Sequence, residues 1–304
     1  GPELNAACKV CGICVKSCPQ KAIVRLETKS VSVDKSGWND ILVFAESSGN
    51  RLHPVSLELI GKARTLARAV PGFKVRAVLV GNGVSACAEE LRHYGVAEIA
   101  VYDDPALGYF RADAYAACVE DYIRSCRPSV VLVGATALGR SLAPRIATRF
   151  HTGLTADCTK LELRENTDLV QIRPAFGGNI MAQIITPNTR PQFATVRYKV
   201  MDAPIREAAA AGNVLARRLP AGVKASRANL VSAFPVPPRK TISDAEILVV
   251  GGRGLRKESD LSLVQELAEL LGGDWAVTRP LVEKGWAGND RQIGLSGRTV
   301  RPRL

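Results

Sequence analysis

Short, continuous apolar runs alternate with longer stretches of helical spacing between residues 41 and 150. The runs that predict strands are Ile41–Ala45, Arg76–Val80, Ala97–Tyr102 and Ser129–Val133. The stretches that predict helices are Leu57–Val70, Ala86–Tyr94, Ala114–Arg124 and Leu142–Phe150, and Asp113 stands where it would cap the third of these helices. Strands that are apolar throughout are typical of sheets buried on both faces. Their alternation with helices predicts a parallel, doubly wound α/β sheet.

From Thr159 the rhythm changes to shorter pieces that resemble strands: Lys160–Leu163, Val170–Arg173, Met181–Ile185 and Phe193–Arg197. The Pro-rich stretch Ala233–Lys240 predicts an interdomain linker. A strand at Glu246–Val250, a glycine turn and a helix at Leu261–Leu271 then predict the start of a second α/β domain. We therefore expect an α/β first domain over residues 37–240 and a second domain over 241–304. The second is too short for a complete doubly wound core, so we expect it to be incomplete as given.

A cysteine run precedes both domains. Cys8-x2-Cys11-x2-Cys14-x3-Cys18-Pro19 has the spacing of a bacterial ferredoxin run. Thiolates are soft ligands suited to iron–sulfur clusters, and zinc sites usually pair their ligands across a longer gap. Residues 1–36 thus predict a ferredoxin-like unit with one [4Fe–4S] cluster. We expect a short strand at Ala22–Leu26, after the cysteine run, and a linker at Lys35–Asp40. Cys18 could serve a second cluster if further residues lie upstream.

The other four cysteines, Cys87, Cys118, Cys126 and Cys158, are scattered singly in apolar or helical contexts, which favours core packing over disulfides. No apolar run reaches the roughly 20 residues of a membrane-spanning helix, and the first residues do not resemble a signal peptide. We expect a cytoplasmic protein without a transmembrane segment.

The formal net charge is +12, but residues 241–304 contain nine Lys/Arg and nine Asp/Glu, so the excess lies in residues 1–240. A basic surface can steer an acidic partner, although a solvated basic surface explains the charge equally well. Nucleic acid is disfavoured, because no groove-reading motif and few stacking aromatics are present.

Three loops of the second domain combine glycines with polar side chains: Gly251–Gly254, Thr278-Arg279-Pro280 and Gln292–Gly297. Glycines between a strand and a helix allow close approach of a ligand to the backbone, and crevices at strand ends bind cofactors. Guanidinium groups stabilise the negative charge of a reduced flavin, and a hydroxyl donor near its N5 tunes its redox chemistry. A surface arginine and a turn serine are the alternatives for Arg279 and Ser296.

The sequence resembles the alpha subunits of electron-transfer flavoproteins over about residues 40–304. The resemblance rests on Arg173–Ala182 with Arg190–Arg197, on Val249–Leu255, and on the loops at Thr278–Pro280 and Gln292–Gly297. It implies a heterodimer with a beta subunit and an FAD-binding, flavodoxin-like second domain. The flavin pocket it implies is formed by Gly252, Arg253, Gly254, Thr278, Arg279, Pro280, Gln292, Gly294, Leu295, Ser296 and Gly297.

Three features qualify the resemblance. Leu295 stands where many members have a polar Gln, and the later segment that binds the ribityl and pyrophosphate parts of FAD is absent. The cysteine run resembles the anaerobic subset that bifurcates electrons from NADH to ferredoxin and to an acyl-CoA, enoyl-CoA or lactate/pyruvate couple. This implies an acyl-CoA or lactate dehydrogenase and ferredoxin as partners. The stretch Gly134–Arg140 could form a nucleotide loop, but a structural role is favoured because this domain of the alpha subunit is generally empty.

The resemblance implies an electron-carrier subunit. The three histidines are spread out (His53, His93, His151) and form no catalytic set, which agrees with the absence of bond-making chemistry. One alternative is an electron-transfer flavoprotein that feeds a membrane quinone reductase without bifurcation. Another is an ATP-using sulfur-transfer enzyme with a cluster, which lacks a convincing phosphate loop at Glu46–Asn50. A third is a docking scaffold in which the cysteine unit is only a structural staple.

Overall fold

We describe a computed structural model of the chain over residues 11–24, 33–48, 50–175, 178–221, 223, 230–234 and 241–304. The chain divides into two compact units, residues 1–32 and 33–304. The first unit contains the short helix α1 (Ile13–Ser17). The second unit contains all the strands and the remaining helices of the described residues, in two sequence segments that we call the first and second domains.

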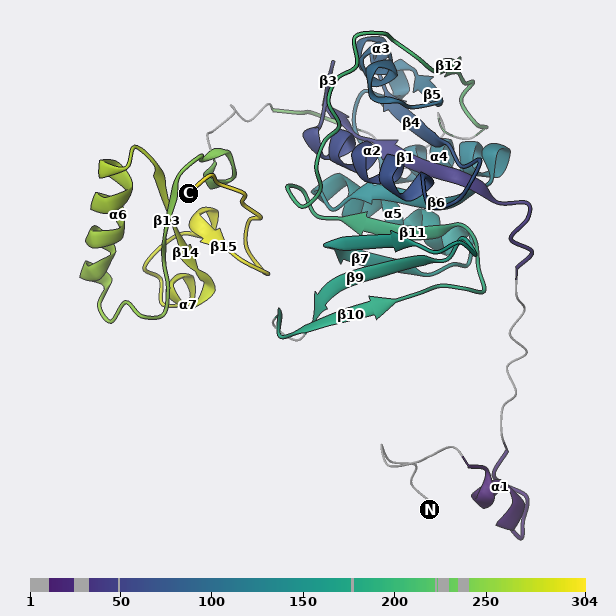
Figure 1. Ribbon diagram of the computed structural model, residues 1–304, viewed down its shortest axis with the longest axis horizontal. Coiled ribbons are helices and arrows are strands. Elements are labelled where there is room, and N and C mark those ends of the chain that lie inside the picture. Colours follow the sequence, from purple (N-terminus) through teal and green to yellow (C-terminus); the bar gives the residue numbers. More distant parts are fainter. Residues whose placement is uncertain are drawn as a thin grey trace. The chain divides into compact units, whose positions relative to one another are not determined.

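The first domain is built on a seven-stranded sheet in the order β12-β5-β4-β1-β6-β11-β7, and every neighbouring pair in it is parallel (Figure 1). Its strands are β1 (Asn39–Ala45), β4 (Val75–Gly81), β5 (Glu98–Asp103), β6 (Pro128–Gly134), β7 (Leu154–Cys158), β11 (Gln192–Val196) and β12 (Asn213–Ala216). The four apolar runs that predicted strands form β1, β4, β5 and β6. The prediction of a large parallel sheet is therefore confirmed.

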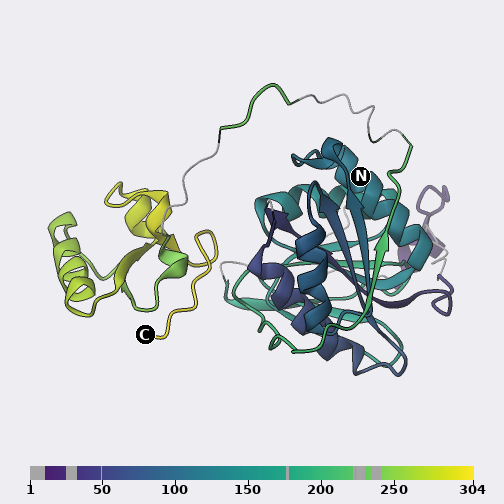
Figure 2. The same cartoon turned by 90° about the horizontal axis from the view of Figure 1, so that it is seen from above.

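Helices cover both faces of this sheet (Figure 2). On one face lie α2 (Pro54–Ala67) and α3 (Ser85–Leu91), and on the other α4 (Ala112–Cys126) and α5 (Ala137–Arg149). In β1, Ile41 and Val43 pack into the core under α2, whereas Leu42 and Phe44 pack into the core under α4 and α5. All four side chains are at most 1% exposed, because alternate residues of a strand point to opposite faces.

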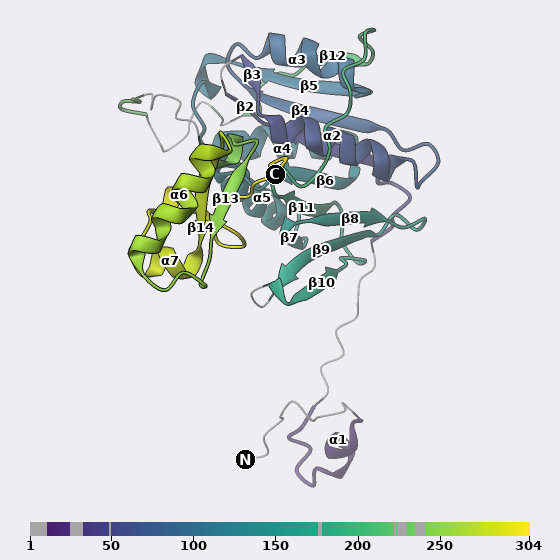
Figure 3. The same ribbon diagram turned by 60° about the vertical axis from the view of Figure 1, so that its left-hand side comes forward.

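A small antiparallel sheet of β8 (Lys160–Leu163), β9 (Leu169–Ala175) and β10 (Ile180–Ile184) lies beside β7, in the order β10-β9-β8 (Figure 3). Three of the four short strands predicted after Thr159 form this sheet. The fourth, predicted at Phe193–Arg197, instead enters the large sheet as β11 between β6 and β7.

The second domain contains a parallel sheet in the order β13-β14-β15, made of β13 (Leu248–Gly251), β14 (Asp274–Thr278) and β15 (Gln292–Ile293). Helices α6 (Leu261–Leu270) and α7 (Arg279–Glu283) connect its strands. Its buried apolar groups are small: one centres on Leu248 and Ala276, another on Val277 and Leu281. The strand and helix predicted here are confirmed.

Three local predictions were wrong. Residues 22–24 form no strand, and residues 25–26 of that prediction lie outside the described part. Asp113 lies in the first turn of α4, where its carboxylate complements the helix dipole, and Arg111 is the N-cap residue. Asn39 and Asp40, assigned to a linker, are the first residues of β1. Asp40 belongs there because its carboxylate accepts hydrogen bonds from the Lys74 amide (2.8 Å) and from Arg76 Nε (2.7 Å).

Gly139 provides a test of how tightly α5 packs on the sheet. A Cβ at this position would lie 1.9 Å from the carbonyl oxygen of Gly134, at the end of β6. We expect Gly139→Ala to destabilise the first domain by about 1–3 kcal/mol, the usual cost of overpacking. Chemical denaturation would measure this change in the free energy of unfolding. Gly37→Ala is the control, because its Cβ would meet nothing closer than 3.7 Å. Equal stability of the two variants would contradict the packing.

Candidate functional site

The three loops predicted to line a flavin pocket leave the same edge of the second sheet. Strand β13 ends at Gly251, β14 at Thr278 and β15 at Ile293. The parallel register pairs Gly251 with Val277 and Thr278 with Ile293. Because carboxyl ends of parallel strands meet at one edge, the loops at residues 251–254, 278–280 and 292–297 come together there although they are separate in sequence.

The glycine turn lies against the second loop. A Cβ on Gly252 would be 3.7 Å from Thr278 Oγ1, and the Leu255 amide donates to the Gly252 carbonyl oxygen at 3.1 Å. Nothing lies within 4 Å of the Cβ position of Gly254. Arg253 is exposed and has no ion-pair partner among the described residues. The turn therefore leaves an open backbone surface beside a free positive charge.

Arg279 begins α7, and Pro280 occupies the first turn of this helix, where a missing N–H costs little. Arg279 Nε donates to Glu283 Oε1 at 2.7 Å, one helical turn later, and both side chains are more than half exposed. Such exposed pairs contribute little to stability, at most about 1 kcal/mol. The guanidinium can therefore exchange Glu283 for a ligand at small cost.

The third loop is a tight turn that needs two glycines. Gly294 has a φ of 106°, and a Cβ on Gly297 would lie 2.5 Å from the Gln292 carbonyl oxygen. The buried Gln292 side chain donates from Nε2 to Ser296 Oγ at 3.0 Å. Since Ser296 Oγ accepts this bond, its own hydrogen remains available for a ligand. Leu295 is 41% exposed and offers only an apolar contact.

The structure thus gathers the predicted residues at one edge, with open backbone at Gly252 and Gly254, cations at Arg253 and Arg279, and hydroxyl groups at Thr278 and Ser296. This donor set fits an anionic, hydrogen-bonding ring system such as a flavin. Whether each residue touches the flavin stays a prediction.

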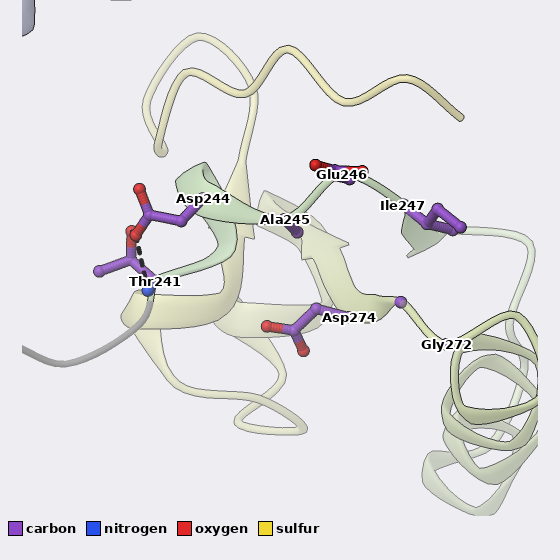
Figure 4. Close-up of a pocket in the computed structure, with 8 residues that line it drawn as sticks. Thr241, Asp244, Ala245, Glu246, Ile247, Gly272 and Asp274 are labelled. Carbon is purple, nitrogen blue, oxygen red and sulfur yellow. Dashed lines mark hydrogen bonds between the residues drawn. The ribbon is translucent and has the colours of Figure 1, made fainter.

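A second hollow in this domain lies at the opposite edge of the sheet. A cavity of about 460 Å³ is lined by residues before β13 and at the start of β14, among them Asp244, Glu246 and Asp274 (Figure 4). Asp244 accepts hydrogen bonds from the Thr241 backbone N–H and hydroxyl. The hydrogen bond from the N–H contributes most to lowering the pKa of the Asp244 carboxyl group. Three carboxyl groups would repel the phosphates of FAD, so this cavity is a poor flavin site.

The first domain has glycine loops at the corresponding edge, but its own carboxylates occupy them. Thr136 Oγ1 accepts from the Gly139 amide (3.0 Å) and donates to Glu46 Oε2 (2.6 Å), which places the carboxylate near the N-terminus of α5. Asp103 accepts from the Gly83 amide at 2.6 Å and from the adjacent amide at 3.1 Å. These bonds support the structural interpretation of Gly134–Arg140. Sequence reasoning missed both carboxylates, because each lies far from its loop in sequence.

The stretch Arg190–Arg197 holds the first domain together. Arg190 Nη2 donates to Asp168 at 2.8 Å, and both side chains are almost fully buried. The Gln192 side chain accepts from the Leu169 amide (2.8 Å) and donates to the Thr167 carbonyl oxygen (2.8 Å), which ties β11 to the turn before β9. Residues 176 and 177 of the other family stretch lie outside the described residues.

Of the predicted cluster ligands, Cys8 lies outside the described residues. Cys11 and Cys14 are exposed free thiols, and Cys18 is half-buried. Backbone N–H groups, first that of Ala22 and then that of Ile23, lower the pKa of the Cys18 thiol. Among residues 11–24 and the later described segments, no group of three or more possible ligands is placed to hold a metal ion. Three thiols on one short segment with amides around a sulfur fit the chemistry of a cluster.

The scattered cysteines are core residues, as predicted. Cys87, Cys118 and Cys158 are at most 1% exposed, and Cys126 packs against the core beneath α4. Burial raises the pKa of Cys118, Cys126 and Cys158 to about 12.

Comparison with family models identifies the protein family to which both domains are similar. Residues 41–221 match the family model for the electron transfer flavoprotein domain, and residues 241–304 match that for the electron transfer flavoprotein FAD-binding domain. The chain belongs to the electron transfer flavoprotein alpha-subunit family. Within the described residues, no helix is long and apolar enough to span a membrane.

Relatives extend this similarity. The chain is 49% identical over 302 residues to the lactate dehydrogenase (NAD(+),ferredoxin) subunit LctC of Acetobacterium woodii, covering 99% of this chain and 72% of that protein. It is 41% identical over 270 residues to the electron transfer flavoprotein subunit alpha of Thermoanaerobacterium thermosaccharolyticum, covering 88% and 81%. Protein FixB of Azorhizobium caulinodans is 38% identical over 272 residues, covering 88% and 73%.

Proposed function

We propose that the chain is the electron-carrying alpha subunit of a heterodimeric, electron-bifurcating electron-transfer flavoprotein that serves a dehydrogenase of the lactate or acyl-CoA type. The observation that carries this proposal is the meeting of three glycine-bearing loops, with two arginines and two hydroxyl groups, at the carboxyl edge of β13–β15. The long similarity to LctC supports the lactate type and, through the printed name of that protein, ferredoxin and NAD⁺ as participants.

FAD in the second domain would supply a redox centre that accepts and gives electrons. In this arrangement the backbone at Gly252 allows the ring to approach closely, and Arg253 and Arg279 offset negative charge on it. Ser296 donates its hydroxyl hydrogen toward the ring while Gln292 holds its oxygen in place. No residue of this site needs to act as a nucleophile or general base, which suits electron transfer.

The cysteine unit would hold one [4Fe–4S] cluster on Cys8, Cys11, Cys14 and Cys18. The supporting observations are the spacing of the run, the exposed thiols of Cys11 and Cys14, and the amides that stabilise the Cys18 thiolate. The cluster would extend the electron path beyond the flavin, toward a ferredoxin.

A beta subunit would cover the outer strand of the small sheet. β10 pairs only with β9 among the described strands, and it leaves Ile180 (54%) and Met181 (53%) exposed, with Ile185 (43%) just beyond it. An exposed apolar edge strand is prone to aggregate unless another chain pairs with or covers it. This edge is the feature of the first domain that most needs a partner.

Cys11→Ser tests the cluster. We expect the variant, purified as the heterodimer, to lose most of its iron and the broad visible absorbance of the cluster while it retains FAD, because the two sites lie in separate sequence units. Iron and flavin per heterodimer are the measurements. Cys126→Ser, at the last residue of α4 and packed against the core of the first domain, is the control and should keep both. Parallel loss of flavin and iron in Cys11→Ser would show that the sites are not separate.

Arg253→Ala tests the flavin site. A charge-assisted contact is worth roughly 1.5–3 kcal/mol, so its removal should lower the FAD potential by about 60–130 mV. Arg253 is the better choice because no carboxylate already offsets its charge, unlike Arg279. Potentiometry on the heterodimer gives the value.

The matched control for this variant is Arg303→Ala. It deletes the same charge from an arginine that is 85% exposed and pairs with Glu246, just before β13 at the other edge of the sheet. A potential within about 15 mV of the parent in both variants, a quarter of a tenfold step, would mean that the glycine turn does not face the flavin.

A further inference from the structure

A cavity of about 630 Å³ lies at the amino edge of the large sheet in the first domain, and none of its lining residues belongs to a loop assigned to FAD. Its walls come from four separate segments: Trp38 before β1, the end of α4 with Arg127, the end of α5 with Arg149 and His151, and Arg190 before β11. The volume lies within the range of small-molecule pockets, about 300–1,000 Å³.

The lining is strongly cationic. Arg124 and Arg149 both pair with Glu120, Arg124 at 2.7 Å, so one carboxylate holds two guanidinium groups side by side. The Arg127 guanidinium has no hydrogen-bond acceptor or ion-pair partner in the described part of the chain. With Arg190, four arginines line this cavity, and among the described residues Glu120 and Asp168 are the carboxylates that pair with them.

Arg190 adds a buried donor without a partner. Its side chain is 0% exposed, and its Nη atoms are satisfied by Asp168 and by carbonyl oxygens that include those of Thr186 and Thr189. Its Nε has no hydrogen-bond partner among the described residues. A charged N–H that is buried without an acceptor costs free energy, so Arg190 is held in the wall of the cavity at a cost to stability.

The backbone is also unusual at this cavity. Arg127 ends α4 with a φ of 44°, and His151 follows α5 with a φ of 49°. Glycine is the usual residue in this left-handed conformation at the ends of helices, because a Cβ makes it unfavourable. Here Arg127 and His151 adopt this conformation instead of glycine, and both residues line the same cavity.

A purely structural role explains part of this pattern. Cations at the C-termini of α4 and α5 balance the helix dipoles, which accounts for Arg124, Arg127 and Arg149. It does not account for Arg190, which lies in a loop before β11, or for Trp38, which precedes β1. Arg124 also lies over the Phe150 ring, with its guanidinium carbon 5.1 Å from the ring centre, so the lining combines cations with aromatic rings.

We propose that this cavity binds a phosphate-bearing nucleotide, with the phosphates against Arg127 and Arg149 and the base against the indole of Trp38. Arginines match phosphate oxygens in a bidentate geometry, and an indole stacks on a flat base. This site is separate from the FAD site and uses no residue of it, so it stands whether or not the proposed electron-transfer function holds.

The test is isothermal titration of the flavin-loaded heterodimer with ADP, adenosine and inorganic pyrophosphate. We expect ADP to bind more tightly than either of the others, because only ADP offers both phosphates and a base. Arg127→Ala should raise the Kd for ADP about tenfold or more, the loss of one charge-assisted contact. Trp38→Phe should weaken ADP but leave pyrophosphate unchanged.

Arg145→Ala is the matched control, since Arg145 is exposed one turn before Arg149 on α5 and does not line the cavity. It should leave the Kd unchanged, and thermal melts would verify that every variant is folded. A Kd for ADP that neither Arg127→Ala nor Trp38→Phe alters overturns the proposal, because any nucleotide then binds elsewhere in the heterodimer. Equal affinity for pyrophosphate and ADP overturns the role of Trp38. A loss of partner-protein binding in Arg127→Ala, without nucleotide binding, would make the cavity a protein-docking surface instead.

Discussion

Parallel strand pairing is the constraint on which the large sheet of the first domain and the sheet of the second domain depend. When every strand points the same way, each connection must cross over the sheet, and all carboxyl ends meet at one edge. In the first domain the crossovers are α2–α5, which bury both faces of β1 and its neighbours. In the second domain the same rule brings Gly252, Thr278 and Ser296 to one place although the chain separates them.

The carboxyl ends of the strands carry opposite charge in the two parallel sheets. We infer that this edge has a structural role in the first domain and binds a ligand in the second. In the first domain Glu46 and Asp103 satisfy the loop amides and the end of α5 from within the chain. In the second domain the loops carry arginines, and the neighbouring carboxylate, Glu283, is exposed and weakly held. Helix N-termini and loop amides attract anions. In the first domain the chain's own carboxylates occupy the place where an anion would bind. In the second domain the arginines leave that place open for an anionic ligand.

Much of the fold could be predicted because its strands are buried on both faces and therefore apolar throughout. β12 was not predicted, because Asn213–Ala216 is only four residues long and its three apolar residues are exposed at the edge of the sheet. Phe193–Val196 was recognised as a strand, but its place between β6 and β7 depends on pairings across 60 residues. Asp113 was misplaced because Asp suits both a cap and a first turn, and side-chain chemistry alone does not choose between them.

The candidate flavin loops could be predicted from glycines and polar residues that are close in sequence within each loop. The contacts between the loops could not be predicted from the sequence. The hydrogen bond from Gln292 to Ser296 could not be predicted either, because the same residues allow other arrangements. The cationic cavity left no trace in the sequence, since Trp38, Arg127, Arg149 and Arg190 come from four segments and each resembles a surface residue alone. Only the sheet, by gathering the amino ends of its strands, brings them together.

Hydrogen–deuterium exchange on the heterodimer, with FAD bound and after its removal, tests the central claim most directly. The account predicts that removal of FAD speeds exchange in residues 251–256, 278–281 and 293–298, at the carboxyl edge of the second sheet. Residues 244–247 and 272–274, at the acidic amino edge, should exchange at the same rate in both states. Protection by FAD that falls on the amino edge, or on neither edge, would contradict the placement of the flavin.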